Sequence, residues 1–167
     1  MAIPKRHGSP PGTYFVTSST WGSRPVFRKD NACQIFIDAL LNYRDRGAYL
    51  LHAFVLMPDH FHVLLTPTAN TSLEHAVKLV KGGSASRIRR ELTYQFPVWQ
   101  RGFSDHRIRD PNDCAMHLRY LEQNPVKKLL VAVPSDFLWS SACGRFPVDD
   151  LPQGLRPLSY SASLRHG

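Results

Sequence analysis

Two histidines lie two residues apart at His60 and His62, and they are the first residues here whose types and spacing suggest joint chemistry. They follow Pro58-Asp59, which is typical of a tight turn, and the pattern predicts a strand over 60–66. Side chains two apart on a strand share one face. Two imidazoles on one face can bind one divalent ion. A half-buried strand without a metal can also carry two histidines, so the spacing alone leaves both interpretations open.

A strand predicted over 49–57 precedes the turn and forms a hairpin with the histidine strand. Pairing across the two-residue turn places Met57 opposite His60 and Val55 opposite His62. The same count pairs His52 with Leu65 and puts it on the opposite face. We therefore expect His52 to have a structural role in the core or at an edge.

A second group of reactive side chains lies near the end of a predicted helix. Tyr120 and Asn124 are four residues apart, so they stack on one helix face, with His117 close by. An amide oxygen can complete a metal shell begun by two imidazoles, and a tyrosine beside that metal can attack a phosphodiester to form a phosphotyrosine. The alternative is structural, with Tyr120 packed on the core and Asn124 capping the helix before Pro125.

Several segments resemble one family in the family's own order. His60-Phe61-His62 looks like the HUH motif of single-strand DNA nucleases, and the wider pattern resembles the REP-associated tyrosine transposases, relatives of single-tyrosine insertion-sequence transposases. The matching blocks are Tyr14–Thr17, Val55–Leu65, Trp99–Phe103, Asp105–His106, Ile108–Asp110, Tyr120–Val126 and Trp139–Ser141.

The resemblance implies an α+β fold of the HUH nuclease type, a ferredoxin-like sandwich with a central, largely antiparallel sheet. It implies that His60 and His62 are metal ligands and that Tyr120 is the nucleophile. Asn124 is the implied third ligand, with Gln123 as the alternative. Asp105-His106 would either orient the site or form a structural pair.

The implied function is a metal-dependent single-stranded DNA endonuclease and strand transferase that acts at hairpin-containing DNA through a 5′-phosphotyrosine intermediate. The metal would be Mg²⁺ or Mn²⁺, and the partner would be single-stranded DNA with hairpins such as REP-like palindromes. The protein would act as a monomer or homodimer. The alternative is a domesticated protein that binds hairpin DNA without transposition activity.

The chain carries a net charge of +8, which suits a protein that meets phosphates. Five of these net charges lie between Ser72 and Arg109. This stretch is either a solvated helix face or a DNA-binding surface. The basic residues that we assign to DNA binding are Lys78, Lys81, Arg87, Arg89, Arg90, Arg101, Arg107 and Arg109.

The remaining pattern predicts the elements that position these residues. Helices are expected over 32–46, over 73–92 after a cap at Thr71 or Ser72, and over 111–124 after a cap at Asp110. Gly82-Gly83 suggests a kink or a close backbone approach in the second helix. Strands are expected over 14–18 and 98–108, and the helices are expected on one face of the sheet.

The length fits one domain, which we divide into a flexible arm (1–12), an HUH tyrosine transposase domain (13–146) and a tail (147–167). The three cysteines are odd in number and far apart, so we expect a reducing compartment. The first residues form no signal-peptide pattern, and no apolar run suits a membrane span. We therefore expect a cytoplasmic protein without a membrane partner, associated with the nucleoid when bound to DNA.

Overall fold

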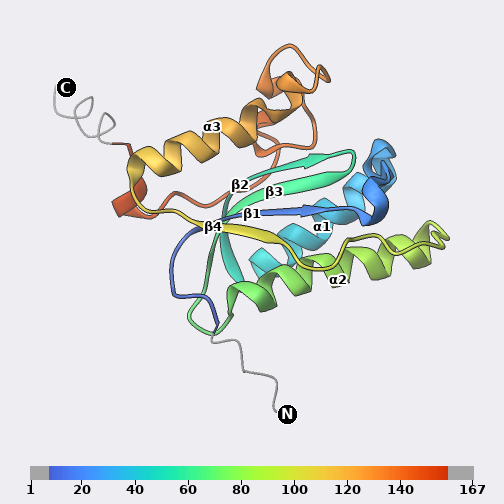
Figure 1. Cartoon of the computed structure of the whole chain (residues 1–167), viewed down its shortest axis with the longest axis horizontal. Helices are drawn as coiled ribbons and strands as arrows, with labels where there is room; N and C mark the ends of the chain where they lie inside the picture. The colour runs from blue at the N-terminus through green and yellow to red at the C-terminus, as the bar shows by residue number, and fades with distance from the viewer. Residues whose placement is uncertain (1–7, 158–167) are drawn as a thin grey trace.

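The computed structural model describes residues 8–157 and follows a β-α-β-β-α-β order that ends in a third helix (Figure 1). The elements are β1 (Tyr14–Ser19), α1 (Asp30–Asp45), β2 (Tyr49–Met57), β3 (His60–Pro67), α2 (Leu73–Glu91), β4 (Ser104–Arg107) and α3 (Pro111–Lys127). Short 3₁₀ segments lie at Trp21–Ser23, Val26–Arg28, Pro134–Asp136, Ser141–Cys143 and Gln153–Leu155.

The four strands form one sheet in the order β2-β3-β1-β4, and every neighbouring pair is antiparallel. This order and connectivity are those of a ferredoxin-like sandwich, which confirms the predicted α+β fold. The expectation of helices on one face is wrong, however. Helices α1 and α2 cover one face of the sheet, whereas α3 covers the other (Figure 1).

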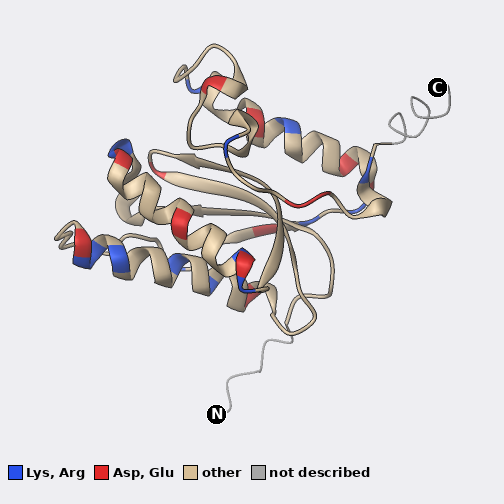
Figure 2. Cartoon of the chain, turned by 180° about the vertical axis from the view of Figure 1, so that it is seen from behind, with Lys and Arg blue, Asp and Glu red and all other residues tan. Residues whose placement is uncertain are grey.

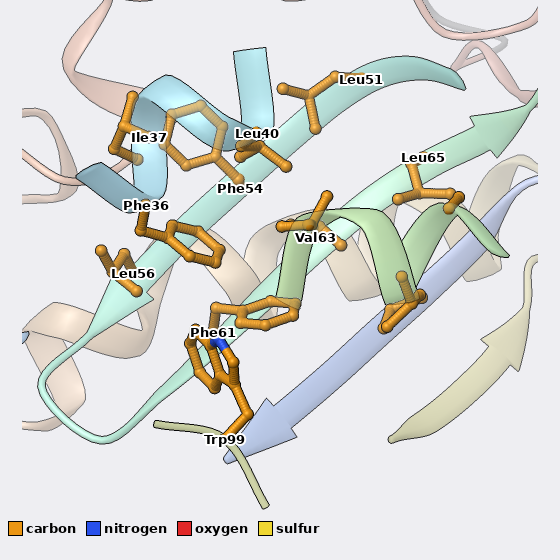
Figure 3. Close-up of a cluster of buried hydrophobic side chains, with 14 of the residues drawn as sticks. Phe36, Ile37, Leu40, Leu51, Phe54, Leu56, Phe61, Val63, Leu65 and Trp99 are labelled. Atoms are coloured by element: carbon orange, nitrogen blue, oxygen red, sulfur yellow. The ribbon is translucent and has the colours of Figure 1, made fainter. Parts of the chain in front are cut away.

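Alternation along β3 assigns its side chains to the two faces. Phe61, Val63 and Leu65 enter the large apolar cluster beneath α1 and α2, where Phe36 and Trp99 pack against Phe61 (Figure 3). His60, His62 and Leu64 point to the face covered by α3, where Leu64 joins a smaller cluster. The alternation of side chains along β3 therefore directs three residues into the large apolar cluster and both histidines to the opposite face.

The β2–β3 hairpin has the predicted two-residue turn, with Met57 opposite His60 and Val55 opposite His62. The predicted pairing of His52 with Leu65 is wrong, because a bulge between Leu51 and Ala53 makes Leu51 the partner of Leu65. His52 bonds instead to the side chain of Thr66 through Nε2 at 2.7 Å and to the carbonyl of Asp149 through Nδ1 at 3.1 Å. Thr66 lies an even number of residues after His60 and His62 on β3, so its side chain is on their face of the sheet. The hydrogen bond to Thr66 therefore places His52 on that face too. Its buried, bonded ring has a structural role.

Helix α2 begins at its predicted cap, where Ser72 Oγ accepts a hydrogen bond from the backbone of His75. The double glycine does not break it, since α2 runs through both residues. A Cβ at position 83 would lie 2.6 Å from Tyr43 Oη on α1, whereas a Cβ at position 82 would meet nothing within 4 Å. Gly83 therefore marks the close approach of two helices.

Helix α3 begins as predicted, with Asp110 Oδ1 accepting from the backbone of Asp113 at 2.7 Å and Pro111 in the first turn. Its predicted end before Pro125 is wrong, because α3 continues to Lys127 with Pro125 inside it. The ring lies in the last turn, so its missing N–H removes only one of the last helical hydrogen bonds. The backbone continues with Lys128 N donating to Asn124 O.

The strand predicted over 98–108 is shorter in the structure. β4 spans four residues, while Trp99 forms only an isolated bridge with Thr20. Gly102 has a φ of 75°, which interrupts the extended backbone between them.

The parts of the arm and tail at 1–7 and 158–167 lie outside the described residues, and the domain boundaries stay predictions. Within the described part of the tail, Asp149 N donates to Leu51 O at 2.7 Å, and its carboxylate pairs with Arg44 at 2.9 Å. This segment therefore lies against β2 and α1. Among the described residues, the helices are too short or too polar to cross a membrane.

Candidate active site

Four polar residues of α3 lie in one stripe along the helix, at Asp113, His117, Tyr120 and Asn124. Their spacing of three or four residues keeps them on one face. Asn124 reaches His60, Tyr120 reaches His62, and His117 reaches Phe15 of β1. The position of α3 across the sheet thus joins the two groups that the sequence holds more than fifty residues apart.

The two histidines are oriented so that the same ring nitrogen is left available on each. His60 Nδ1 lies 2.7 Å from Asp59 Oδ1, and His62 Nδ1 lies 2.6 Å from Thr17 Oγ1. Since a carboxylate accepts, Asp59 fixes the proton of His60 on Nδ1 and leaves the lone pair on Nε2. Nε2 of His62 is buried and has no hydrogen-bond partner within residues 8–157. The ring centroids are 4.9 Å apart.

Burial determines the charge state of the inner histidine. Desolvation, with a smaller contribution from His60, lowers the pKa of His62 to about 3. Its ring is therefore neutral at neutral pH, which is the state that a metal ligand requires.

The sequence leaves two side-chain amides, Asn124 and Gln123, as candidates for the third metal ligand, and Asn124 is the buried one. Its Nδ2 lies 3.3 Å from Nε2 of His60. Gln123 is half-buried on the next position of the helix. The contact to the histidine pair thus belongs to Asn124.

Tyr120 lies beside the pair and is open to solvent, with 49% of its surface exposed. Its ring contacts that of His62 at a centroid distance of 5.4 Å and that of Phe15 at 6.1 Å. A hollow of about 510 Å³ is lined by Tyr120, His62, His117, Phe15 and Thr17, with Ser104 and Met116 at its sides. An elongated ligand in this hollow would meet the phenol and the inner histidine together.

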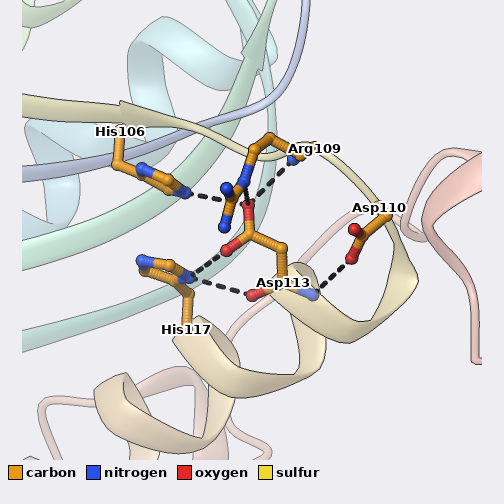
Figure 4. A network of polar contacts seen from close by, with 5 residues as sticks. All are labelled: His106, Arg109, Asp110, Asp113 and His117. Carbon is orange, nitrogen blue, oxygen red and sulfur yellow. Dashed lines mark hydrogen bonds and ion pairs between the residues drawn. The ribbon is translucent and has the colours of Figure 1, made fainter.

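A hydrogen-bonded network joins β4 to the beginning of α3 (Figure 4). His106 Nε2 lies 2.8 Å from Asp113 Oδ2, and the backbone of Arg109 donates to the same oxygen at 2.9 Å. Burial opposes ionisation of Asp113, but the hydrogen bonds from His106 and Arg109 outweigh it and hold its pKa well below the usual range. His106, Asp113 and His117 bring atoms of the types that bind metals within 4.8 Å of one another. His106 of the Asp105-His106 pair thus has a partner on α3.

Sequence reasoning missed a second hollow, on the other side of His60. It measures about 580 Å³, and its lining includes His60, Asp59, Arg28 and Lys128. Lys128 directly follows the end of α3, and Arg28 lies in a 3₁₀ turn far away in the sequence. In the sequence, the sign of this basic hollow was the lysine pair Lys127-Lys128, which follows the Tyr120 motif.

The predicted DNA-binding residues are spread over the molecule, and those of α2 lie across the sheet from the histidine pair (Figure 2). Several have partners within the chain. Lys81 Nζ donates to the carbonyls of Gln100 and Gly102, Arg87 pairs with Glu91 at 2.7 Å, Arg107 donates to Pro11 O and Arg109 to Asp113. Lys78, Arg89, Arg90 and Arg101 are exposed, as are Arg107 and Arg109, and Arg90 lies 3.9 Å from the Glu91 carboxylate.

Comparisons with known proteins identify the family of the chain. Residues 14–124 match the family model described as "Transposase IS200 like". A Haemophilus influenzae protein named as a REP-associated tyrosine transposase is 31% identical over 106 residues, which cover 53% of this chain and 56% of that protein. The Escherichia coli REP-associated tyrosine transposase is 27% identical over 155 residues, which cover 81% of this chain and 87% of that protein.

One solved structure, a REP-associated tyrosine transposase bound to a REP hairpin, has the same fold. Its TM-score is 0.68 at 24% identity, and the match covers 95% of this chain and 96% of that one. The family match spans every strand and most of α3, including Tyr120 and Asn124. The chain therefore belongs to the IS200-like transposase family, and it resembles the REP-associated tyrosine transposases in sequence and fold.

Proposed function

We propose that this transposase cuts and rejoins single-stranded DNA beside a hairpin, with Tyr120 as the nucleophile and a divalent ion bound by His60, His62 and Asn124. One observation carries the proposal. Two imidazoles of β3 have their Nδ1 atoms engaged by Asp59 and Thr17, and they lie beside an exposed tyrosine.

The residues present fit such an ion. In the part of the chain that the structure describes, Nε2 of His62 is a buried polar atom without a partner, and Nε2 of His60 lies beside the Asn124 amide. A half-turn of that amide would exchange its nitrogen for its oxygen, which is a metal ligand. We favour Mg²⁺ or Mn²⁺, because both suit sites that also bind phosphate oxygens. The bound ion would polarise the non-bridging oxygens of the phosphate.

Tyr120 supplies the covalent step. Its phenol oxygen forms a bond to the phosphorus, the bond to the 3′ oxygen breaks, and that oxygen leaves with the electron pair and becomes a 3′ hydroxyl. The 5′ phosphate stays on Tyr120. Attack by another 3′ hydroxyl reverses the step and joins two strands. No ATP is needed, since one phosphodiester replaces another.

The DNA partner is inferred from charge and from the relatives. The solved relative is bound to a REP hairpin, and a hairpin with single-stranded flanks is the substrate that we propose here. The exposed residues Lys78, Arg89, Arg90 and Arg101, with Arg107, Arg109, Lys81 and Arg87 as a secondary set, would contact backbone phosphates. A DNA substrate would place the protein in the cytoplasm at the nucleoid.

Incubation with end-labelled hairpin single strands and Mg²⁺ or Mn²⁺ tests the proposal. We expect an adduct that survives denaturation, disappears in Tyr120→Phe and maps to Tyr120 by mass spectrometry. Hairpin binding by Tyr120→Phe should equal that of the wild type, because the change removes one oxygen from an exposed ring. Binding without any adduct would instead support a domesticated hairpin-binding protein.

A further inference from the structure

One ring nitrogen of His117 is held by Asp113, and the other points away from Asp113. Its Nδ1 lies 2.9 Å from the main-chain oxygen of Asp113 and 3.2 Å from Asp113 Oδ1. Both are acceptors, so Nδ1 carries the hydrogen and the lone pair of the neutral ring is on Nε2. In Figure 4 the second nitrogen points away from Asp113. His117 lines the same hollow as Tyr120 and His62.

Three elements hold this ring in place. The ring of His106 on β4 stacks on it at a centroid distance of 4.4 Å and an angle of 11° (Figure 4). Phe15 of β1 contacts it at 5.0 Å. Asp113 of α3 joins both histidines, and its own backbone is capped by Asp110. A ring held from three sides is preoriented at low entropic cost.

Most of this cluster is already hydrogen-bonded within the chain, with Asp113 Oδ2 held by His106 and His117 Nδ1 held by the main-chain oxygen of Asp113, whereas Asp113 Oδ1 has no hydrogen-bond partner among the described residues. His106 and His117 direct ring nitrogens at Asp113, and Arg109 Nε lies 3.3 Å from Asp113 Oδ2. A cation at this point would have to displace both imidazole contacts and face a guanidinium. The cluster is thus a hydrogen-bond network that positions a base.

We propose that His117 accepts the phenol proton of Tyr120 during DNA cleavage, with His106 and Asp113 as positioning residues; this rests on the proposed function. The phenol proton passes to Nε2 of His117 as the Tyr120 oxygen bonds to phosphorus. The bond to the 3′ oxygen breaks with its electron pair, and that oxygen takes a proton from water. The imidazolium then returns its proton to the hydroxide so formed. Strand joining runs these steps in reverse: water gives a proton to Nε2 of His117, the hydroxide so formed takes the proton of the attacking 3′ hydroxyl, and the imidazolium protonates the departing phenolate.

The polar residues along one face of α3 then have different roles. Asn124 lies at the histidine pair, Tyr120 is one turn earlier, and His117 precedes Tyr120 by three residues on the same face. The network to β4 lies near the beginning of α3, whereas the contact with the histidine pair lies near its end.

Rates of adduct formation on labelled hairpin DNA test the proposal. A general base contributes about 100-fold or more, so His117→Ala should slow adduct formation by about that factor while hairpin binding stays unchanged. His117→Asn keeps a donor for the Asp113 carbonyl but has no base at the Nε2 position, so it should be equally slow. His75→Ala, which alters an exposed histidine on α2, should react at the wild-type rate.

Added imidazoles separate a chemical role from a packing role. Small imidazoles of graded basicity should restore the rate of His117→Ala in proportion to their basicity. Rescue that is independent of basicity, full activity of His117→Asn, or a wild-type rate in His117→Ala would overturn the role of His117. A wild type that forms no adduct on Tyr120 would instead contradict the proposed function.

Discussion

The two faces of the sheet differ in how completely they are packed. Among the described residues, the face beneath α1 and α2 holds a cluster of 24 buried residues, whereas the face beneath α3 holds eight. On the first face the buried polar atom of Trp99 is satisfied, since Nε1 donates to Ser84 Oγ at 3.0 Å. On the second face Nε2 of His62 has no hydrogen-bond partner from any described residue.

This difference indicates that stability and chemistry are separated across the sheet. Burial of apolar surface gives most of the folding free energy, so the α1–α2 face stabilises the fold. An unpartnered buried nitrogen costs about 1–3 kcal/mol, which the well-packed face can offset. The α3 face can then keep open hollows and lone pairs beside Tyr120. Changes on one face should therefore affect stability, and changes on the other should affect DNA cleavage.

The largest effect is expected at the histidine pair. His60→Ala and His62→Ala should each abolish adduct formation, because each removes a proposed metal ligand. Mn²⁺ should raise the Tm of the wild type, since a ligand bound to the folded state stabilises it, but not that of either variant. Calorimetry with and without Mn²⁺ measures this. Unchanged cleavage by either variant would contradict the assignment of the pair.

The next effect is expected on the packed face. Phe36 is fully buried against Phe27, Phe61 and Trp99. Phe36→Ala should lower the free energy of unfolding by about 3–5 kcal/mol, because it leaves a cavity in the core. Urea unfolding gives the value, and the adduct rate per folded molecule should not change. A specific loss of cleavage in the folded variant would show that the two faces are coupled.

The glycine pair of α2 offers a smaller, matched test of packing between α1 and α2. Gly83→Ala should lower stability by about 1–3 kcal/mol, because its Cβ would overlap the ring of Tyr43. Gly82→Ala should raise stability by up to about 1 kcal/mol, since alanine is the better helix former and the space is open. Equal Tm values for the two variants would contradict the close approach of the helices.

The smallest effect is expected when single positive charges are removed, and it tests which face of the sheet binds the DNA. Lys128→Ala and Arg28→Ala remove cations from the hollow beside His60. If each contacts a phosphate of a single strand, each should flatten the log–log salt dependence of binding by about 0.7. Lys78→Ala changes one of the proposed phosphate contacts on the far face, and it should flatten the slope by the same amount. A change of slope for Lys78→Ala alone would place the DNA along α2.

Local features of this protein were readable from the sequence. The hairpin at Pro58-Asp59, the shared face of His60 and His62, and the caps at Ser72 and Asp110 all match the structure. They depend on strand parity, turn chemistry and helix capping, which involve residues close together in the chain. The family motifs added the ferredoxin-like fold and the candidate nucleophile.

Other features were decided only by tertiary structure. Helix α3 covers the face opposite α1 and α2, and this placement brings Asn124 to His60 and Tyr120 to His62. The close approach of Gly83 to Tyr43 likewise joins distant segments, and the bulge that turns His52 and the stacking of His106 on His117 depend on how neighbouring elements pack. A sequence pattern records the apolar face of a helix, but which surface that face covers depends on packing among all the elements at once.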